Sequence, residues 1–184
     1  MKKMLFALLA ISGTSMTMAA DKPFTAEVLV GQATFEIDDF INDDDTSSII
    51  RLAYEFADSW SAEAAFQNYG DVSTKIEDEG DTETYEYSTS AFTLGVKKTF
   101  ALNDQFSLNA RAGIALWEIE SVERDEDGTS TATNSSNDLY YGVGLDYALT
   151  DSLSLSAEYT MIAAEDDSTD IDLSNIAVGV GYQF

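Results

Sequence analysis

The sequence predicts an all-β fold: an eight-stranded antiparallel up-and-down transmembrane β-barrel, preceded by a cleavable signal peptide. Three observations lead to this prediction. Eight segments alternate large apolar residues with small or charged ones at a period of two, as strands between two different environments do. The connections between these segments are alternately short and long. No segment after the N-terminus has the roughly 20 consecutive apolar residues of a transmembrane helix, so a membrane-embedded chain would have to be a barrel.

The first 20 residues have the three parts of a signal peptide. Lys2 and Lys3 supply a positive start, Met4–Ile11 is apolar, and Gly13–Ala20 is small and polar. The apolar part has about eight residues, which is too few to span a bilayer as a helix. We therefore expect residues 1–20 to be a signal peptide cleaved near Ala19 or Ala20, and residues 21–184 to form one outer-membrane barrel domain.

The eight predicted strands are each about ten residues or slightly longer, enough to cross a hydrocarbon layer when tilted. They are Thr25–Ile37, Ser48–Ala57, Trp60–Tyr69, Ser90–Phe100, Gln105–Ile119, Asp138–Leu149, Leu153–Ala163 and Ser174–Phe184. The last strand shows the alternation most cleanly, because large residues at even positions face small residues at odd positions from Ile176 to Phe184. We expect it to pair with the first strand and so to remove both sheet edges.

The predicted connections fall into two classes. Asp58-Ser59, Ala101–Asp104 and Thr150–Ser152 are hairpin-sized and contain the turn formers Asn, Asp and Ser. The other four connections are longer: Asp38–Ser47, Gly70–Thr89, Glu120–Asn137 and Ala164–Leu173. Outer-membrane barrels have this organisation, with short periplasmic turns and long external loops.

The two faces of the strands predict which side meets lipid. Glycine recurs on the face that also carries the charges, at Gly95, Gly113, Gly142, Gly144, Gly179 and Gly181. Small residues beside charges fit the narrow interior of an eight-stranded barrel, whereas charges on a free surface need no glycine next to them. We therefore place the Leu, Val, Phe and Tyr face outside. Aromatic residues form two expected girdles, one near the short turns (Trp60, Phe100, Phe106, Tyr147, Phe184) and one near the other end (Tyr69, Phe92, Tyr140, Tyr141).

The inward face is predicted to hold a lumen charge network. Its members are Glu27, Arg51, Glu55, Glu63, Lys97, Arg111, Asp146 and Glu158. Charges removed from bulk water must be paired or hydrated, and these residues converge only if the sheet closes. Two interpretations remain open: a structural plug of ion pairs that fills the barrel, and a gate or ion path through it.

Composition excludes several kinds of chemistry. The chain has no Cys and no His, so it lacks thiolate chemistry, the usual general base and the usual zinc ligand. Carboxylates inside a narrow barrel offer no substrate cleft, and we expect neither enzymatic activity nor a cofactor. Without Lys2 and Lys3, 9 basic residues become 7 against 34 acidic ones, and the net charge goes from −25 to −27. So acidic a chain repels nucleic acid.

The long connections are densely acidic. Clustered carboxylates favour Ca²⁺ or Mg²⁺, and the weak candidates for a metal site are Asp125, Asp127, Asp166 and Asp170. The alternative is that these segments are solvated and repel one another. A third interpretation is that divalent cations bridge them to the phosphates of lipopolysaccharide.

Two motifs resemble those of the small outer-membrane β-barrel proteins related to the transmembrane domain of OmpA and to OmpX. The first is the hairpin Tyr141–Leu155, with the sequence YGVGLDYALTDSLSL, and the second is Val178–Phe184, with the sequence VGVGYQF. The resemblance implies a Gram-negative outer-membrane location and an interior Arg–Glu network. It also implies that the assembly machinery reads Val178, Val180, Tyr182 and Phe184 as its C-terminal signal. Since Phe184 ends the sequence, the peptidoglycan-binding domain and wall-tethering role of full-length OmpA are not expected.

The expected function is that of a monomeric outer-membrane protein with a structural or surface-interaction role through its long acidic external loops. Its expected partners are outer-membrane lipid, lipopolysaccharide and, during insertion, the assembly machinery. One alternative is a narrow porin-like ion channel through the charged lumen. Another is a soluble periplasmic ligand-binding barrel, in which the large apolar residues would face inward.

Overall fold

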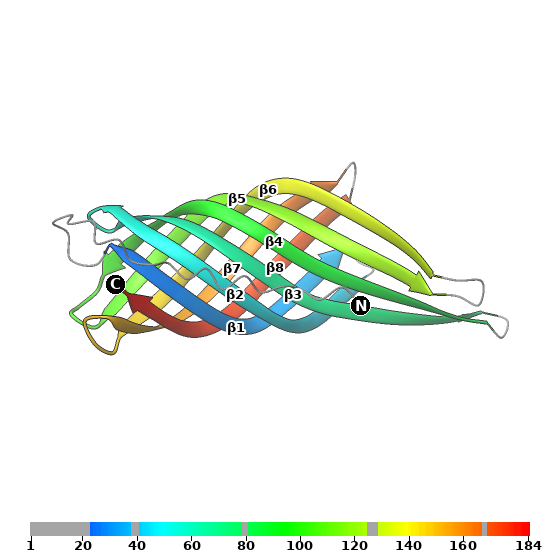
Figure 1. Cartoon of the computed structure of the whole chain (residues 1–184), viewed down its shortest axis with the longest axis horizontal. Coiled ribbons are helices and arrows are strands. Elements are labelled where there is room, and N and C mark those ends of the chain that lie inside the picture. The colour runs from blue at the N-terminus through cyan, green and yellow to red at the C-terminus, as the bar shows by residue number, and fades with distance from the viewer. Residues whose placement is uncertain (1–22, 38–40, 79–80, 125–128, 167–168) are drawn as a thin grey trace.

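The protein is a closed β-barrel of eight antiparallel strands. A computed structural model describes residues 23–37, 41–78, 81–124, 129–166 and 169–184. The strands are β1 Phe24–Ile37, β2 Ile41–Ala57, β3 Trp60–Asp78, β4 Asp81–Ala101, β5 Phe106–Arg124, β6 Thr129–Ala148, β7 Leu153–Asp166 and β8 Thr169–Gln183. Each strand pairs with the next in the sequence, and β8 pairs with β1 (Figure 1). The predicted fold class is confirmed, while the predicted signal peptide, residues 1–20, lies outside the described residues.

The first and last strands close the barrel as predicted. Their register runs from Thr25 opposite Gln183 to Ile37 opposite Ile171. Below it, Phe24 and Phe184 exchange two backbone hydrogen bonds, with N···O distances of 3.2 and 2.8 Å. The backbone N–H and C=O groups of both edge strands are thereby paired with each other, which removes a template for aggregation.

Three short turns join the strands at one end of the barrel, here called the short-turn end. Ser59 adopts a left-handed backbone, φ 66°, in the two-residue turn between β2 and β3. In the next turn the side-chain oxygen of Asn103 accepts hydrogen bonds from the backbone N–H groups of Gln105 and Phe106. Thr150 does the same for Ser152 and Leu153 in the third. Of the residue types expected to form these turns, Asn103 acts through its side chain and Ser59 through its backbone, while Thr150 was not expected.

The four long loops expected from the sequence are mostly strand, and this expectation was wrong. Residues 41–47, 70–78, 81–89, 120–124, 129–137, 164–166 and 169–173 all belong to strands, which have 14 to 21 residues each. The connections at this end are 38–40, 79–80, 125–128 and 167–168, outside the described residues. The density of charge concealed the strands, because a sheet that leaves the membrane needs no apolar face to keep its ladder of backbone hydrogen bonds.

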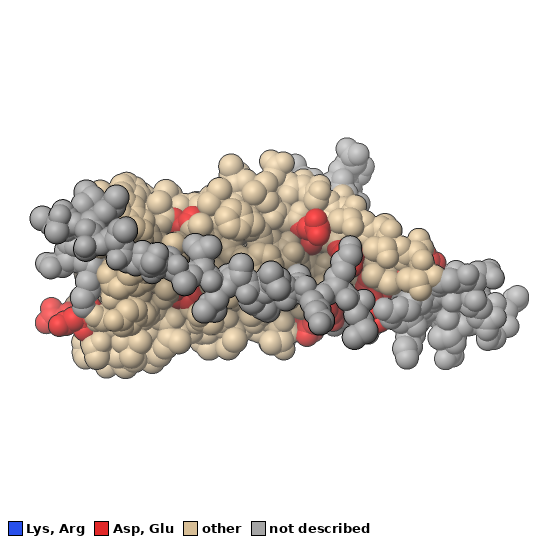
Figure 2. Space-filling view, viewed as in Figure 1, with Lys and Arg blue, Asp and Glu red and all other residues tan. Residues whose placement is uncertain are grey.

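The outward and inward faces of the barrel wall differ as the sequence predicted. Leu52, Leu94, Val143 and Leu155 are all exposed, with 39 to 59% of their surface accessible. In Figure 2 the visible wall between the ends is mostly uncharged. A wall of this kind requires an apolar solvent, which a bilayer provides. The described residues contain no helix that is long and apolar enough to cross a membrane.

Two members of the predicted outer girdles lie inside the barrel. Tyr69 is 1% and Tyr140 5% exposed, so neither contacts lipid. Residues an even number of positions apart on a strand point to the same face, which we call strand parity. By this rule Tyr69 shares the inward face of Glu63 on β3, and Tyr140 shares that of Gly142 on β6. Phe92 and Tyr141 remain on the outer face at that height.

Candidate functional site

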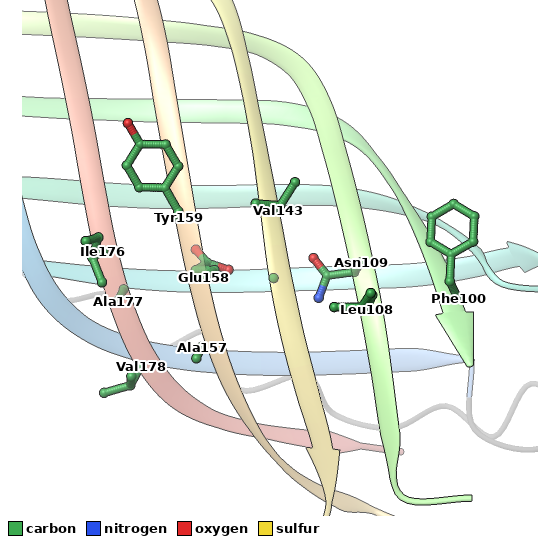
Figure 3. Close-up of a pocket in the computed structure, with 11 residues that line it drawn as sticks. Phe100, Leu108, Asn109, Val143, Ala157, Glu158, Tyr159, Ile176, Ala177 and Val178 are labelled. Carbon is green, nitrogen blue, oxygen red and sulfur yellow. The ribbon is translucent and has the colours of Figure 1, made fainter. Parts of the chain in front are cut away.

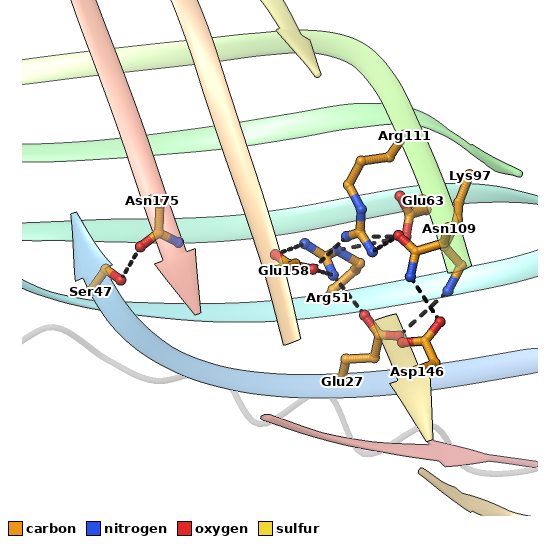
Figure 4. Close-up of polar contacts among 10 residues, drawn as sticks. All are labelled: Glu27, Ser47, Arg51, Glu63, Lys97, Asn109, Arg111, Asp146, Glu158 and Asn175. Atoms are coloured by element: carbon orange, nitrogen blue, oxygen red, sulfur yellow. Dashed lines mark hydrogen bonds and ion pairs between the residues drawn. The ribbon is translucent and has the colours of Figure 1, made fainter. Parts of the chain in front are cut away.

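The lower half of the barrel interior, toward the short turns, holds a compact network of charges. Arg51 is its centre: its Nη1 donates to Glu27 Oε2 at 2.7 Å and to Glu158 Oε2 at 2.8 Å, and its Nη2 donates to Glu158 Oε1 at 2.8 Å (Figure 4). Planar guanidinium and carboxylate groups form such paired bonds with strong directional preference. The two-pronged contact fixes Arg51 and Glu158 relative to each other across the lumen.

Two further cations complete this network. Arg111 Nη1 lies 2.9 Å from Glu158 Oε2 and 3.6 Å from Glu63 Oε1, and Arg51 Nε lies 3.7 Å from the same Glu63 oxygen. Lys97 Nζ lies 3.5 Å from Glu27 Oε1. Three cations therefore face three carboxylates, all less than 9% exposed. Their formal charges cancel, which is what burial of charge requires.

We call these six residues, from β1, β2, β3, β4, β5 and β7, the lumen charge network: Glu27, Arg51, Glu63, Lys97, Arg111 and Glu158. Six of the eight residues that the sequence placed together therefore meet. Asp146 is half-buried beside them and accepts a 2.8 Å hydrogen bond from Asn109 Nδ2, while Asn109 Oδ1 accepts from Arg111 Nη2 at 3.3 Å. The amide of Asn109 thus joins Asp146 to the network, a role that sequence reasoning missed.

Glu55 does not join the network, and its assignment to the lumen is corrected. The residue is exposed beside the first short turn and accepts a 3.3 Å hydrogen bond from the backbone N–H of Ser59. The pairing of β2 with β3 shifts register between Glu55 and Ala57. The shift comes after Glu55, which still pairs with Ser61 in step with Ala53 and Glu63, so it is the position of Glu55 at the rim, beside the turn, that separates it from the network.

Glycines on the inward face make room for the larger side chains. A Cβ added at Gly142 would lie 2.7 Å from Thr160 Cγ2 and 3.2 Å from Arg111 Cγ. One added at Gly113 would lie 2.7 Å from Cε1 of Tyr140. The glycine and charge pattern seen in the sequence therefore has a steric cause, since Arg111 and Tyr140 occupy the volume that these glycines leave.

The upper half of the interior, away from the short turns, holds an apolar cluster beside a few buried polar residues, such as Ser47, whose Oγ–H donates to Asn175 Oδ1 at 2.5 Å. The apolar cluster, here called the apolar plug, contains Ala33, Phe35, Tyr69, Ala91, Ala115, Trp117, Tyr140, Ile162 and Leu173. Each strand that supplies both regions places the charge nearer the short turns, for example Arg111 before Trp117 on β5 and Glu158 before Ile162 on β7. A smaller apolar cluster of Leu29, Ile49, Ala65 and Ala177 also lies inside the barrel.

Trp117 is the largest buried side chain of the apolar plug and is 1% exposed. Its Nε1–H donates to Asp138 Oδ2 at 2.6 Å, which satisfies the one polar atom of the indole. Sequence reasoning missed this residue, although strand parity with Arg111 already placed it on the inner face.

The upper end of the barrel divides into two sheets. β2 pairs with β3 no further than Ser48 opposite Asn68, and β6 pairs with β7 only from Leu139 on. Beyond these points β3, β4, β5 and β6 continue together and reach further than the other strands (Figure 1). We call their parts within residues 70–78, 81–89, 120–124 and 129–137 the acidic extension, because these strand residues include eight acidic and two basic ones.

The predicted metal candidates find no support in the described side chains. Asp125 and Asp127 lie outside the described residues, and of Asp166 and Asp170 the structure describes the strand positions only. Where side chains are described, no group of three or more potential ligands is gathered closely enough to hold an ion.

The residues of the predicted assembly signal share the outer face of β8. Val178, Val180, Tyr182 and Phe184 are 43 to 56% exposed. Phe184 stacks on Phe24, with ring centroids 5.9 Å apart, and on Tyr182 at 6.3 Å. The C-terminal aromatic therefore lies at the seam where β8 meets β1.

Comparison with known proteins agrees with this architecture. A family model described as "Outer membrane protein beta-barrel domain" matches residues 5–184. The chain is similar to the crystal structure of Ail, the attachment invasion locus protein of Yersinia pestis, with a TM-score of 0.59 and 18% identity over 90% of this chain and 100% of that one. The crystal structure of Neisserial surface protein A matches with a TM-score of 0.61 and 14% identity, over 89% of this chain and 98% of that one. The crystal structure of OprG from Pseudomonas aeruginosa matches with a TM-score of 0.60 and 16% identity, over 90% of this chain and 98% of that one. No curated protein matches by sequence.

Proposed function

The chain belongs to the outer membrane protein β-barrel domain family, and from that premise we propose that it is a monomeric surface-interaction protein whose working surface is the acidic extension. The observation that carries this proposal is the division of the upper end. Strands β3 to β6 stay paired with one another beyond the last paired residues of β2 with β3 and of β6 with β7. A purely structural barrel has no need of such strands.

Two features of the acidic extension suit it to binding. Its eight acidic residues attract cations over a range set by ionic strength. Its last strand carries small polar residues from Thr129 to Asn137, pairs with β5 on one side and meets β7 only from Leu139 on. Sheet edges of this kind accept extended segments of partner proteins.

Lipopolysaccharide, linked through divalent cations, is the partner that we propose for this surface. Direct contact between carboxylates and phosphates is repulsive, and Ca²⁺ or Mg²⁺ has the oxygen preference needed to bridge them. Residues 1–20 act as a signal peptide in this proposal, and the short turns face the periplasm. Strong negative charge also argues against a nucleic-acid partner.

A shortened variant tests the surface. Residues 72–87 and 121–132 would each be replaced by Asn-Gly, which joins the register partners Asp71 with Ser88 and Glu120 with Thr133. We expect the full chain to associate with lipopolysaccharide in Mg²⁺ and to lose this in a chelator, and the shortened variant not to associate in either condition. The matched control keeps the sheet and removes charge, through Glu86→Gln, Glu120→Gln and Glu123→Gln. Equal association of all three proteins would overturn the proposal.

We do not propose a channel or an enzyme. The lumen charge network pairs across the barrel, and the apolar plug stands above it, so the interior supports a closed lumen. Planar-bilayer recordings test this, and stepwise conductance of the purified full chain would contradict it. The chain has no His to act with a serine, and the buried carboxylates are engaged with arginines.

The C-terminal residues support a role in assembly. The ring of Phe184 lies on the outer surface at the seam between β8 and β1, where insertion machinery can reach it. Deletion of Phe184 is expected to lower the amount of barrel in the outer membrane more than it lowers the stability of refolded protein. Normal membrane levels after the deletion would contradict this role.

A further inference from the structure

The outer wall of the barrel carries a groove of about 530 Å³ that runs across β4 to β8. Its sides are large apolar residues, Phe100, Leu108, Val143, Tyr159, Ile176 and Val178, which Figure 3 shows spread from one side of the view to the other. Its floor is low at Ala157, whose small side chain faces outward between these larger residues. The groove falls in the size range of protein sites for small molecules.

The groove descends toward the short-turn end as it crosses the wall. One row of register partners runs from Phe100 to Leu108, Leu145, Ala157 and Val178. Phe100 is the next-to-last residue of β4, whereas Val178 lies well inside β8, which ends at Gln183. One end of the groove is therefore at the rim of the barrel and the other is deep in the hydrocarbon layer, the path that an acyl chain takes from its headgroup.

A cation stands beside the rim end of this groove, outside the residues that line it. Lys98 is two residues from Phe100 on the same face of β4. Its Nζ lies 5.1 Å from the centre of the Trp60 ring and 3.4 Å from the carbonyl oxygen of Asp58, in the first short turn. These contacts place the ammonium at headgroup height, beside an aromatic residue of the interfacial girdle.

Lys98 differs from the other cations whose side chains the structure describes. Arg51, Lys97 and Arg111 are buried in the lumen and paired with carboxylates. Lys98 is half-buried on the outer wall, and among the described residues it forms no ion pair. In a protein this acidic, a lone outward cation at headgroup height complements a phosphate.

We infer that this surface is a binding site for one anionic glycerophospholipid of the leaflet on the short-turn side. Lys98 contacts the phosphate, with Trp60 beside it, and one acyl chain lies along the groove between Leu108 and Val178. The site is specific where the surrounding wall is not, because among the described side chains Lys98 is the one cation on the outer wall, and the groove begins beside it. This inference is independent of any partner of the acidic extension.

The two tryptophans of the chain provide a direct assay. Trp60 is 41% exposed on the wall beside Lys98, whereas Trp117 is 1% exposed inside the apolar plug and gives a constant background. The full chain would be reconstituted in phosphatidylcholine that contains a small fraction of brominated phosphatidylglycerol, a quencher of tryptophan fluorescence. Compared with the same fraction of brominated phosphatidylcholine, we expect about fivefold stronger association with the protein, the usual preference that one surface lysine confers.

Four variants separate the contributions. Lys98→Gln should remove the preference for phosphatidylglycerol, and Lys98→Arg should retain it. Ala157→Phe fills the groove and should lower it several-fold. Ala112→Phe adds the same bulk on the outer face of β5, outside the groove lining, and should leave the preference unchanged. Since all three positions face outward, the folded state of each variant can be verified by its urea titration.

Equal quenching by both brominated lipids in the unmodified protein would overturn the site. So would a preference that survives Lys98→Gln. If Lys98→Gln removed the preference for phosphatidylglycerol and Ala157→Phe left it unchanged, only the headgroup would be recognised. That result would overturn the role of the groove.

Discussion

The two halves of the barrel interior are stabilised in different ways. The lumen charge network fills the half toward the short turns with directional contacts, six of which join cations to carboxylates within 4 Å. The apolar plug fills the half toward the acidic extension with aromatic and aliphatic side chains. The stability of the lumen charge network depends on every charged partner being present, and that of the apolar plug depends on how completely side chains fill its volume.

This difference teaches how a narrow barrel can be closed without a loop inside it. A buried ion pair is a weak source of stability compared with apolar residues of the same shape, but loss of one partner is severe. The apolar plug responds in smaller steps, because its loss scales with the cavity that a substitution leaves. In the lumen charge network, loss of one partner should therefore cost most of the stability that the network provides. In the apolar plug, the loss of stability should grow with the volume removed. Four substitutions, from the largest expected effect to the smallest, test this contrast.

The largest effect is expected at the centre of the lumen charge network. Arg51→Ala leaves Glu27 and Glu158 buried without their main partner and should lower the free energy of unfolding by about 3–5 kcal/mol. Urea titration in lipid vesicles measures this loss. The combination of Arg51→Met with Glu27→Gln and Glu158→Gln should recover more than half of it. An unchanged midpoint for Arg51→Ala would mean that water hydrates each charge separately.

A deletion of volume in the apolar plug should cost somewhat less. Leu173 is fully buried, and Leu173→Ala should lower the free energy of unfolding by about 2–5 kcal/mol in the same titration. Leu173→Met keeps most of the volume and should cost less than about 1.5 kcal/mol. If both variants lost the same amount, the plug would depend on shape and not on volume, and the contrast between the two halves would fail.

The polar contact of the apolar plug should be weaker than either. Trp117→Phe removes the indole N–H that donates to Asp138 at 2.6 Å and should lower the free energy of unfolding by about 1–3 kcal/mol. The double variant with Asp138→Ala, which removes the acceptor, isolates the hydrogen bond from the change in ring size. Additive effects of the two substitutions would show that the contact contributes nothing of its own.

Strand parity explains why so much of the interior could be predicted from the sequence. Residues two apart share a face, and this one rule placed Glu27, Arg51, Glu63, Lys97, Arg111 and Glu158 on the inner face, where the structure brings them together. The same rule pointed to Tyr69, Tyr140 and Trp117. They were missed because aromatics in a membrane barrel suggest lipid contact, and that association was given more weight than parity.

Two features required the three-dimensional register. The acidic extension resembled loops, because the sequence does not show that Asp71 pairs with Ser88 or Glu120 with Thr133. The groove on the wall brings Phe100 of β4 to the same surface as Ile176 of β8, four strands away. Periodicity along one strand carries no information about the offset between strands, and that offset sets both features.

The smallest effect is expected at Glu55, which lies at the rim of the barrel and outside the lumen charge network. Because this carboxylate is exposed beside the first short turn, Glu55→Gln should change the free energy of unfolding by no more than about 0.5 kcal/mol. Glu63→Gln is the matched substitution on the next strand; Glu63 lies between Arg51 and Arg111, and its loss unbalances three cations against two carboxylates. The Glu63 variant should therefore be clearly less stable than the Glu55 variant in the same urea titration. Equal effects would place Glu55 back in the network, because only a shared set of partners makes the two glutamates equivalent.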